Sequence, residues 1–146
     1  KVINLGKSLL QAVTNEAGQQ PYLVPIGERA ESILESYDDR QIGTQEALKQ
    51  LEKLLTEYVQ AQKEREQSGF DLNTFTIYWV LKQESTSEPE TIAPHVDAAI
   101  RRFPNHVYNA TQRRQLKAEL YKVLLPAIGK ARMVELANRL LRLERR

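Results

Sequence analysis

The chain has 146 residues, 41% of them hydrophobic and 27% charged, with a formal net charge of +2 and no cysteine. This length suits about one domain, and the ordinary balance of apolar and charged residues argues against an intrinsically disordered chain. A disulfide framework is excluded, no apolar run reaches the roughly 18 residues of a membrane span, and no signal peptide opens the chain. We therefore expect a cytoplasmic globular protein with no membrane contact.

Apolar residues recur at helical spacing through the first half of the chain. A first stripe spans residues 2–13, and a second spans residues 26–37 and stops around Gly43. Thr44 is predicted to cap the next helix, because its hydroxyl can accept a hydrogen bond from a free amide of the first turn. This third helix is the longest and reaches about Gln67.

The segment FDLNTFTIYWVLKQE, residues 70–84, carries two conflicting signals. Thr76, Ile77 and Val80 favour a strand by propensity, whereas the spacing of its other apolar residues is helical. A lone strand would leave its backbone groups unpaired, and no other segment offers a pairing partner. We therefore predict a helix, and we expect the aromatic side chains Phe75, Tyr78 and Trp79 to be core rather than a base-stacking platform.

The remaining chain predicts three helices. The first begins at Pro89 and runs over residues 90–103, and the second is capped by Thr111 and interrupted by Pro126 and Gly129. The last is the segment KARMVELANRLLRLERR. The resulting fold class is all-α, a single domain of about six to seven amphipathic helices in an irregular bundle over residues 1–146. The chain starts at Lys1 rather than at methionine, which predicts a piece of a larger protein.

Charge is distributed unevenly along this predicted domain. Residues 1–98 contain nine Lys and Arg against sixteen Asp and Glu, whereas residues 99–146 contain twelve against three. We therefore distinguish an acidic helical part, residues 1–88, from a basic helical part, residues 89–146. A basic surface of this kind indicates an anionic partner such as the backbone of double-stranded DNA, or docking on the protein's own acidic half.

The basic part contains two arginine-rich stripes that could follow phosphates. Arg114, Lys117 and Tyr121 share one face of a helix, with leucines on the opposite face, and Arg132, Arg139 and Arg146 repeat every seven residues. Phosphate recognition needs only charge and reach. The candidate DNA-contact residues are Arg101, Arg102, Arg113, Arg114, Lys117, Arg132 and Arg139. The alternative is that this basic face pairs with acidic residues of the second and third helices; Tyr108 and Tyr121, interleaved with the arginines, stay open to either interpretation.

No catalytic, metal or cofactor site is predicted. Gly6-Lys7-Ser8 matches the end of a phosphate-binding loop, but Lys1 occupies the first glycine position and the surrounding stripe is helical. His95 and His106 stand eleven residues apart and fall in different predicted elements, so they share no helical face and each is expected to be a surface or capping residue.

Three blocks of the sequence resemble the C-terminal helical region of the R (motor and restriction) subunits of type I restriction-modification enzymes. They are IGERAESILESYDDRQIGTQEALKQLEKLL, SGFDLNTFTIYWVL and FPNHVYNATQRRQLKAELYKVLL, and together they cover most of residues 26–143. In the first block the residues that carry the resemblance are Gly27, Ala30, Ile33, Tyr37, Ile42, Thr44, Glu46, Leu48 and Leu51. The order and spacing of the blocks are more specific than any one of them.

The resemblance implies that this chain is a C-terminal fragment of a larger R subunit. Such R subunits carry a Mg-dependent nuclease domain and two helicase domains that hydrolyse ATP to translocate duplex DNA, which makes the parent a type I site-specific deoxyribonuclease. Their helical region docks this motor onto the methyltransferase core of M and S subunits. No catalytic motif of the family matches this chain, so ATP and Mg belong to the parent and the fragment itself is expected to be non-catalytic and without cofactor. The alternative is a stand-alone helical protein-interaction adaptor that contacts no nucleic acid.

Overall fold

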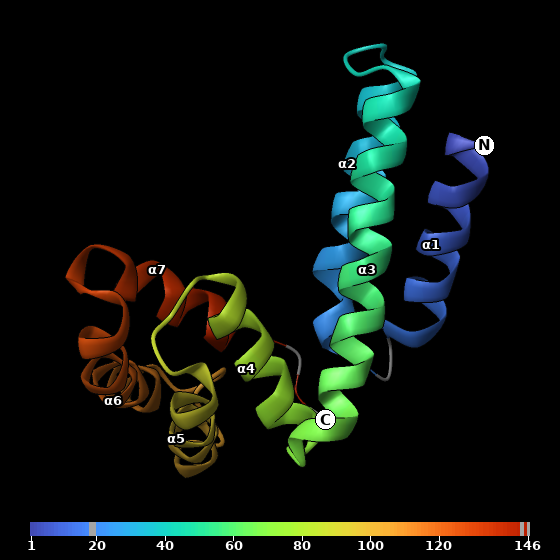
Figure 1. The fold of residues 1–146 in the computed structure, drawn as a ribbon. Helices are drawn as coiled ribbons and strands as arrows, with labels where there is room; N and C mark the ends of the chain where they lie inside the picture. Colours follow the sequence, from blue (N-terminus) through green and yellow to red (C-terminus); the bar gives the residue numbers. More distant parts are fainter. Residues whose placement is uncertain (18–19, 144, 146) are drawn as a thin grey trace. The chain divides into compact units, whose positions relative to one another are not determined.

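The computed structural model describes residues 1–17, 20–143 and 145, and Figure 1 shows their arrangement into helices. This part of the chain contains seven α-helices, one short 3₁₀ helix and no strand. The predicted all-α fold class is therefore confirmed. The described residues gather into two compact units, Lys1–Gly69 and Phe70–Arg146, which are called unit 1 and unit 2 below. Arg146, which extended the predicted seven-residue arginine spacing, lies outside the described residues.

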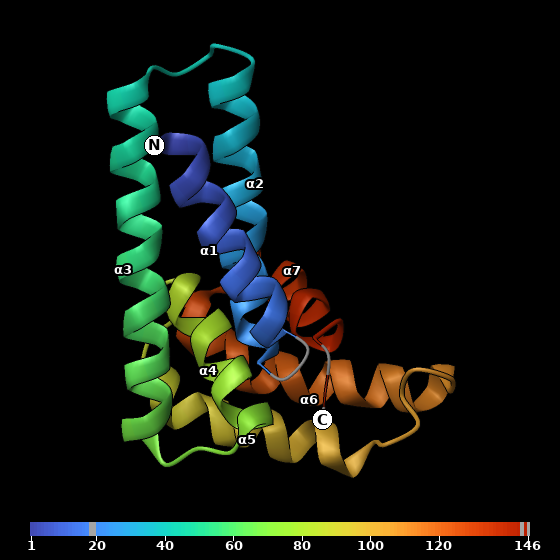
Figure 2. The same cartoon turned by 90° about the vertical axis from the view of Figure 1, so that its right-hand side faces the viewer.

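Unit 1 is a three-helix bundle. It consists of α1 (Val2–Ala17), the 3₁₀ helix η1 (Pro21–Leu23), α2 (Val24–Asp38) and α3 (Thr44–Ser68). Each of the three α-helices packs against the other two, and α2 and α3 run antiparallel on either side of the turn at residues 39–43 (Figure 2). Its buried apolar side chains include Leu9, Val13, Tyr22, Ile26, Ala30, Leu51 and Leu54.

Two glycines let α1 and α2 approach closely. A Cβ atom added at Gly6 of α1 would lie 2.4 Å from Cδ2 of Leu34 in α2, and one added at Gly27 of α2 would lie 3.0 Å from Cγ1 of Val13 in α1. Gly6 is therefore a packing residue inside a helix. Lys7 and Ser8 are exposed positions of the same helix, so the helical interpretation of this segment is confirmed.

Unit 2 contains four helices. They are α4 (Leu72–Gln83), α5 (Pro89–Arg102), α6 (Ala110–Ile128) and α7 (Lys130–Leu141), and each packs against the next along the chain. Their shared core consists of Ile77, Val80, Leu81, Ala93, Val96, Ala99, Ile100, Leu116, Leu120, Leu124, Leu136, Ala137 and Leu140. The leucines of α6 lie at four-residue spacing on its inner face, as the sequence predicts.

The segment with mixed strand and helix signals forms α4. Asp71 caps the helix, and its Oδ1 accepts a hydrogen bond of 2.8 Å from the backbone N–H of Thr74. Thr76 fits the helix because its hydroxyl donates to the carbonyl of Leu72 at 2.8 Å. Phe75 and Trp79 are buried, with their ring centroids 5.9 Å apart, which confirms that these aromatic residues belong to the core.

Three local predictions are wrong. Thr44 is the first residue of α3 rather than its cap, and the cap residue Gly43 has no side chain to accept a hydrogen bond. The cap of α6 is Asn109, two residues before Thr111, and its Oδ1 accepts from the backbone N–H of Gln112 at 3.0 Å. Pro126 does not end α6; it lies inside the last turn, and the helix ends before Gly129, which has a φ of 87°.

Candidate nucleic-acid interface

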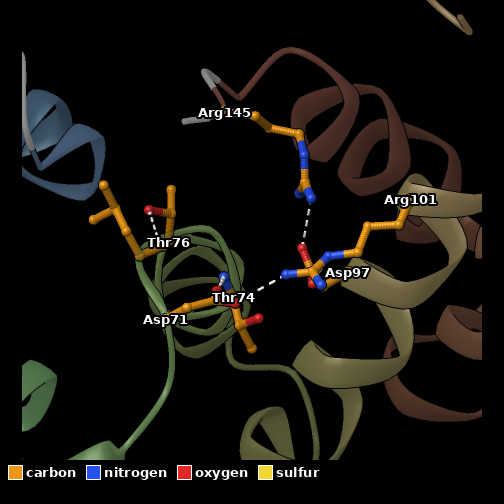
Figure 3. A network of polar contacts seen from close by, with 7 residues as sticks. Asp71, Thr74, Thr76, Asp97, Arg101 and Arg145 are labelled. Atoms are coloured by element: carbon orange, nitrogen blue, oxygen red, sulfur yellow. Dashed lines mark hydrogen bonds and ion pairs between the residues drawn. The ribbon is translucent and has the colours of Figure 1, made fainter. Parts of the chain in front are cut away.

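The two arginines that end α5 are both engaged by carboxylates. Arg101 donates from Nε to Oδ2 of Asp97 at 2.8 Å and from Nη2 to Oδ2 of Asp71 at 2.9 Å, as Figure 3 shows. Arg102 forms an ion pair of 3.3 Å with Glu119 of α6. Both guanidinium groups remain more than half exposed, but each already has a negative partner beside it.

Asp97 is the centre of this network. Its side chain is only 7% exposed, and its second oxygen, Oδ1, accepts from Nη2 of Arg145 at 2.7 Å (Figure 3). A buried carboxylate is stable only when it is paired and hydrogen-bonded, and the two guanidinium groups satisfy both of its oxygens. Asp97 therefore ties Arg145, beyond the end of α7, to α5.

The same arrangement recurs between α4 and α7. Glu84, the residue that follows α4, accepts from Nη2 of Arg132 at 2.7 Å and also binds Nη1 of Arg139. The seven-residue spacing puts these two arginines two turns apart on one face of α7, as predicted. This arginine face of α7 is therefore paired with Glu84, a carboxylate of the same unit.

Arg113 has a different partner. Its Nε donates to the carbonyl oxygen of His106 at 3.1 Å, and its Nη2 donates to the carbonyl oxygen of Val107. These carbonyls belong to the loop between α5 and α6, residues 103–109, so Arg113 holds a loop in place. His106 itself is buried and its Nδ1 lies 2.9 Å from the carbonyl oxygen of Phe103, at the C-terminal end of α5, which fits the expected capping role.

Among the described residues, Arg114 and Lys117 are the candidates that neither a carboxylate nor a backbone carbonyl engages. Arg114 is exposed and its one polar contact is a long one, 3.5 Å, to the hydroxyl of Thr111. Lys117 is half-buried one turn further along α6. Within the described part of the chain, no acidic side chain lies at ion-pair distance from either. The exposed Arg142, which follows α7, shares this property.

The environment of Asp71 changes its acidity. The backbone N–H of Thr74 holds the pKa of the Asp71 carboxyl below its ordinary value of 3.8, and the Thr74 hydroxyl and the Arg101 guanidinium lower this pKa further against the opposing effect of burial. A lowered pKa means that the ionised carboxylate stabilises the fold. The group has the geometry of a helix cap and an ion-pair partner, and nothing around it indicates a proton-transfer role.

The candidate residues therefore fall into three groups. Arg101 and Arg102 lie at the end of α5, Arg113, Arg114 and Lys117 lie in the first turns of α6, and Arg132 and Arg139 lie on α7. The acidic partners that the structure gives these arginines belong to unit 2. Pairing of the basic face with the second and third helices stays a prediction. The spacing of Asp97 and Arg101, four residues apart on one helix, was a local signal for one of these pairs.

Among the described residues, no three acidic or histidine side chains gather closely enough to hold a metal ion. None of the described helices combines the length and the apolar character that crossing a membrane requires.

The chain has no counterpart in the comparisons made with known proteins. No protein-family model matches it, and neither does any curated protein or solved structure. The resemblance to type I R subunits stays a prediction from the residues.

Proposed function

We propose that this chain is a non-catalytic assembly domain of a type I restriction enzyme R subunit. In this role it docks an ATP-dependent DNA translocase and endonuclease onto a methyltransferase core of M and S subunits. It also contributes contacts to the DNA backbone that do not depend on base sequence. The resemblance of most of residues 26–143 to R subunits supports this choice of family, and the exposed side chains of the structure support the choice of contact surfaces.

One observation supports docking above the others. Helix α3 exposes 40% of Leu55 and 56% of Val59, which are four residues apart and therefore lie on one face of the helix. These two neighbouring aliphatic side chains interrupt the otherwise polar outer face of α3 and could form the apolar centre of a contact with another protein. We assign this face of α3 to the methyltransferase contact.

Co-purification with the partner methyltransferase tests this assignment. The double variant Leu55→Glu and Val59→Glu should abolish co-purification, because two charges would have to be buried in an apolar contact. The matched control is Thr56→Glu and Gln60→Glu, which adds the same charges at neighbouring exposed positions of α3 and should bind as the wild type does. Equal binding by the two variants at low salt would refute this docking face.

Fewer residues are assigned to the DNA contact than the seven candidates that the sequence indicates. Arg114 and Lys117 lie three residues apart on α6, and no acidic side chain among the described residues of unit 2 lies at ion-pair distance from either, so phosphate groups can take that place. Replacing both by alanine should weaken binding to all duplex sequences alike and reduce the slope of log affinity against log salt by about 1–2. The control, Lys49→Ala with Lys53→Ala, removes the same charge from exposed positions of α3 and should leave that slope unchanged.

A second function has an observation of its own. Arg101, Arg102, Arg132 and Arg139 are all paired with carboxylates of unit 2. This internal compensation supports the alternative, a helical protein-interaction adaptor that contacts no nucleic acid. A gel shift with duplex DNA at low ionic strength separates the two functions, because the adaptor should leave the duplex unshifted.

A further inference from the structure

The α5–α6 loop, residues 103–109, is held firmly by hydrogen bonds from its own backbone. The N–H of His106 donates to the carbonyl of Phe103 at 3.1 Å, and the N–H groups of Tyr108 and Asn109 donate to the carbonyl of Asn105 at 3.0 and 2.9 Å. These bonds form successive turns. A loop with this many internal bonds has little conformational entropy left to lose on binding.

Side chains from α6 add to this support. The backbone N–H of Asn105 donates to Oε1 of Gln112 at 3.0 Å, and Arg113 donates to the carbonyls of His106 and Val107. The loop is therefore attached to the first turn of α6 at three consecutive residues. Its conformation is fixed by contacts that leave the side chains of Val107 and Tyr108 uninvolved.

Those two side chains are directed away from the protein. Tyr108 is 93% exposed and Val107 is 56% exposed. Each of the other five tyrosines of the chain that the structure places is less exposed than this, and Tyr22 is fully buried. A fixed loop that presents an aromatic ring almost entirely to solvent has the form of a binding contact that is preorganised for its ligand.

The residues that follow this loop in the chain include three positively charged ones, Arg113, Arg114 and Lys117. Arg113 follows the loop and has backbone carbonyls rather than carboxylates as partners, and Arg114 and Lys117 come next on α6 without acidic partners in the described chain. A ligand for this surface must offer both negative charge and a face that stacks on an aromatic ring. A nucleotide with an exposed base has both properties.

We propose that Tyr108 stacks on an unpaired nucleobase of DNA while Arg114 and Lys117 contact the neighbouring phosphates. This inference rests on the DNA contact of the proposed function and extends it, because it assigns a preference for DNA with accessible bases over intact duplex. In intact duplex the base faces are covered by stacking, so the ring has nothing to bind there.

Fluorescence anisotropy of the whole chain with two labelled probes tests the assignment. The first probe is oligo(dT) of about 12 nucleotides, within the usual site size of such surfaces. The second has the same length and charge but consists of abasic nucleotides. Tyr108→Ala should weaken oligo(dT) binding roughly 5- to 100-fold, the range that base–aromatic stacking gives, and should leave the abasic probe unchanged. Tyr108→Phe keeps the ring and should bind as the wild type does.

The outcomes separate this inference from the proposed function. If Tyr108→Ala binds oligo(dT) as tightly as the wild type, or weakens both probes equally, the stacking assignment is overturned even where duplex binding persists. Loss of duplex and oligo(dT) binding on changing Arg114 and Lys117, together with a Tyr108 effect confined to bases, supports both. A wild-type chain that binds neither probe nor duplex overturns the DNA contact and the inference together. Because Tyr108 is exposed, its replacement is not expected to unfold the protein, and far-UV circular dichroism checks this.

Discussion

The helices of unit 1 meet mainly through apolar side chains and two close-packed glycines, whereas in unit 2 four carboxylates also bind arginines across neighbouring elements. Asp71 binds Arg101, Asp97 binds Arg145, Glu84 binds Arg132 and Arg139, and Glu119 binds Arg102. In unit 1 the ion pair between Arg29 and Glu57 links α2 and α3, and both side chains remain substantially exposed. Many of the arginines of unit 2 are therefore paired with carboxylates of the same unit.

This difference shows why segment charge is a poor measure of the charge that a ligand meets. Residues 99–146 carry an excess of nine positive charges by count. Several of these are compensated by carboxylates that lie earlier in the chain, at Asp71, Glu84 and Asp97. The sites with free positive charge are consequently fewer and more local than composition indicates.

The largest loss of stability is expected from a substitution in the apolar core of unit 2, which separates the stability of unit 2 from that of unit 1. Leu120 is fully buried, and Leu120→Ala should destabilise the fold by about 2–5 kcal/mol, because it removes buried methyl groups and leaves a cavity. Urea unfolding followed by the fluorescence of Trp79, the chain's one tryptophan, reports on unit 2.

The matched variant in unit 1 is Leu51→Ala, also fully buried. It should lower the stability seen by far-UV circular dichroism and shift the Trp79 transition less than Leu120→Ala does. Equal shifts of the Trp79 midpoint would mean that the two units unfold as one cooperative block.

A smaller effect tests the close helix packing of unit 1. Gly6→Ala should destabilise the fold by up to about 2 kcal/mol, because overpacking against Leu34 costs about 1–3 kcal/mol and better helix propensity returns about 1 kcal/mol. The Gly27→Ala variant is the control with more space, and its effect should be smaller. Adding Leu34→Ala to Gly6→Ala should recover part of the loss; if Gly6→Ala were stabilising by itself, the close approach would carry no energetic weight.

The ion pairs of unit 2 should contribute less to stability than the cores do. Glu84→Gln should reduce the free energy of unfolding by about 1 kcal/mol or less, because partly exposed pairs contribute about 0.2–1 kcal/mol each. It also frees Arg132 and Arg139, so affinity for duplex DNA at low salt should rise. Glu57→Gln changes the net charge equally but frees only Arg29, and a similar gain for both variants would show that overall charge alone is responsible.

The smallest effect concerns the pH dependence that Asp71 gives to unit 2. Its folded-state pKa is lowered, so its contribution is fully present above the pKa of the unfolded chain, near 3.8, and is lost as the pH falls through the lower folded-state value. Asp71→Asn keeps a capping side chain but removes the charge. Urea titrations from neutral to acidic pH should show a weaker loss of stability in this variant below about pH 5. The same acid sensitivity in variant and wild type would assign it to other carboxylates.

Local periodicity was enough to predict the helices and much of the core. The spacing of Leu116, Leu120 and Leu124 predicted the buried face of α6, and the apolar content of residues 72–81 outweighed the strand propensity of Thr76. Such features depend on neighbours within one or two turns, which the sequence displays directly.

Capping was predicted less well because several residue types can perform it. Thr111 and Asn109 are both suitable caps, and the choice depends on which backbone is extended at that point; Asn109 has φ −121° and ψ 110°. Gly6 similarly has no distinctive sequence signal, because its role depends on Leu34 in another helix.

The sequence by itself determined that this chain is helical, where its charges stand along the helices and which leucines face inward. Only the tertiary structure decided which cations stay available to a ligand, since Arg132 and Arg139 bind a carboxylate 48 and 55 residues away, and Arg145 binds one 48 residues away. It also decided that Tyr108 stays exposed on a firmly held loop. The physical reason is that periodicity is a property of adjacent turns, whereas charge compensation depends on which side chains the fold brings within a few ångströms of each other.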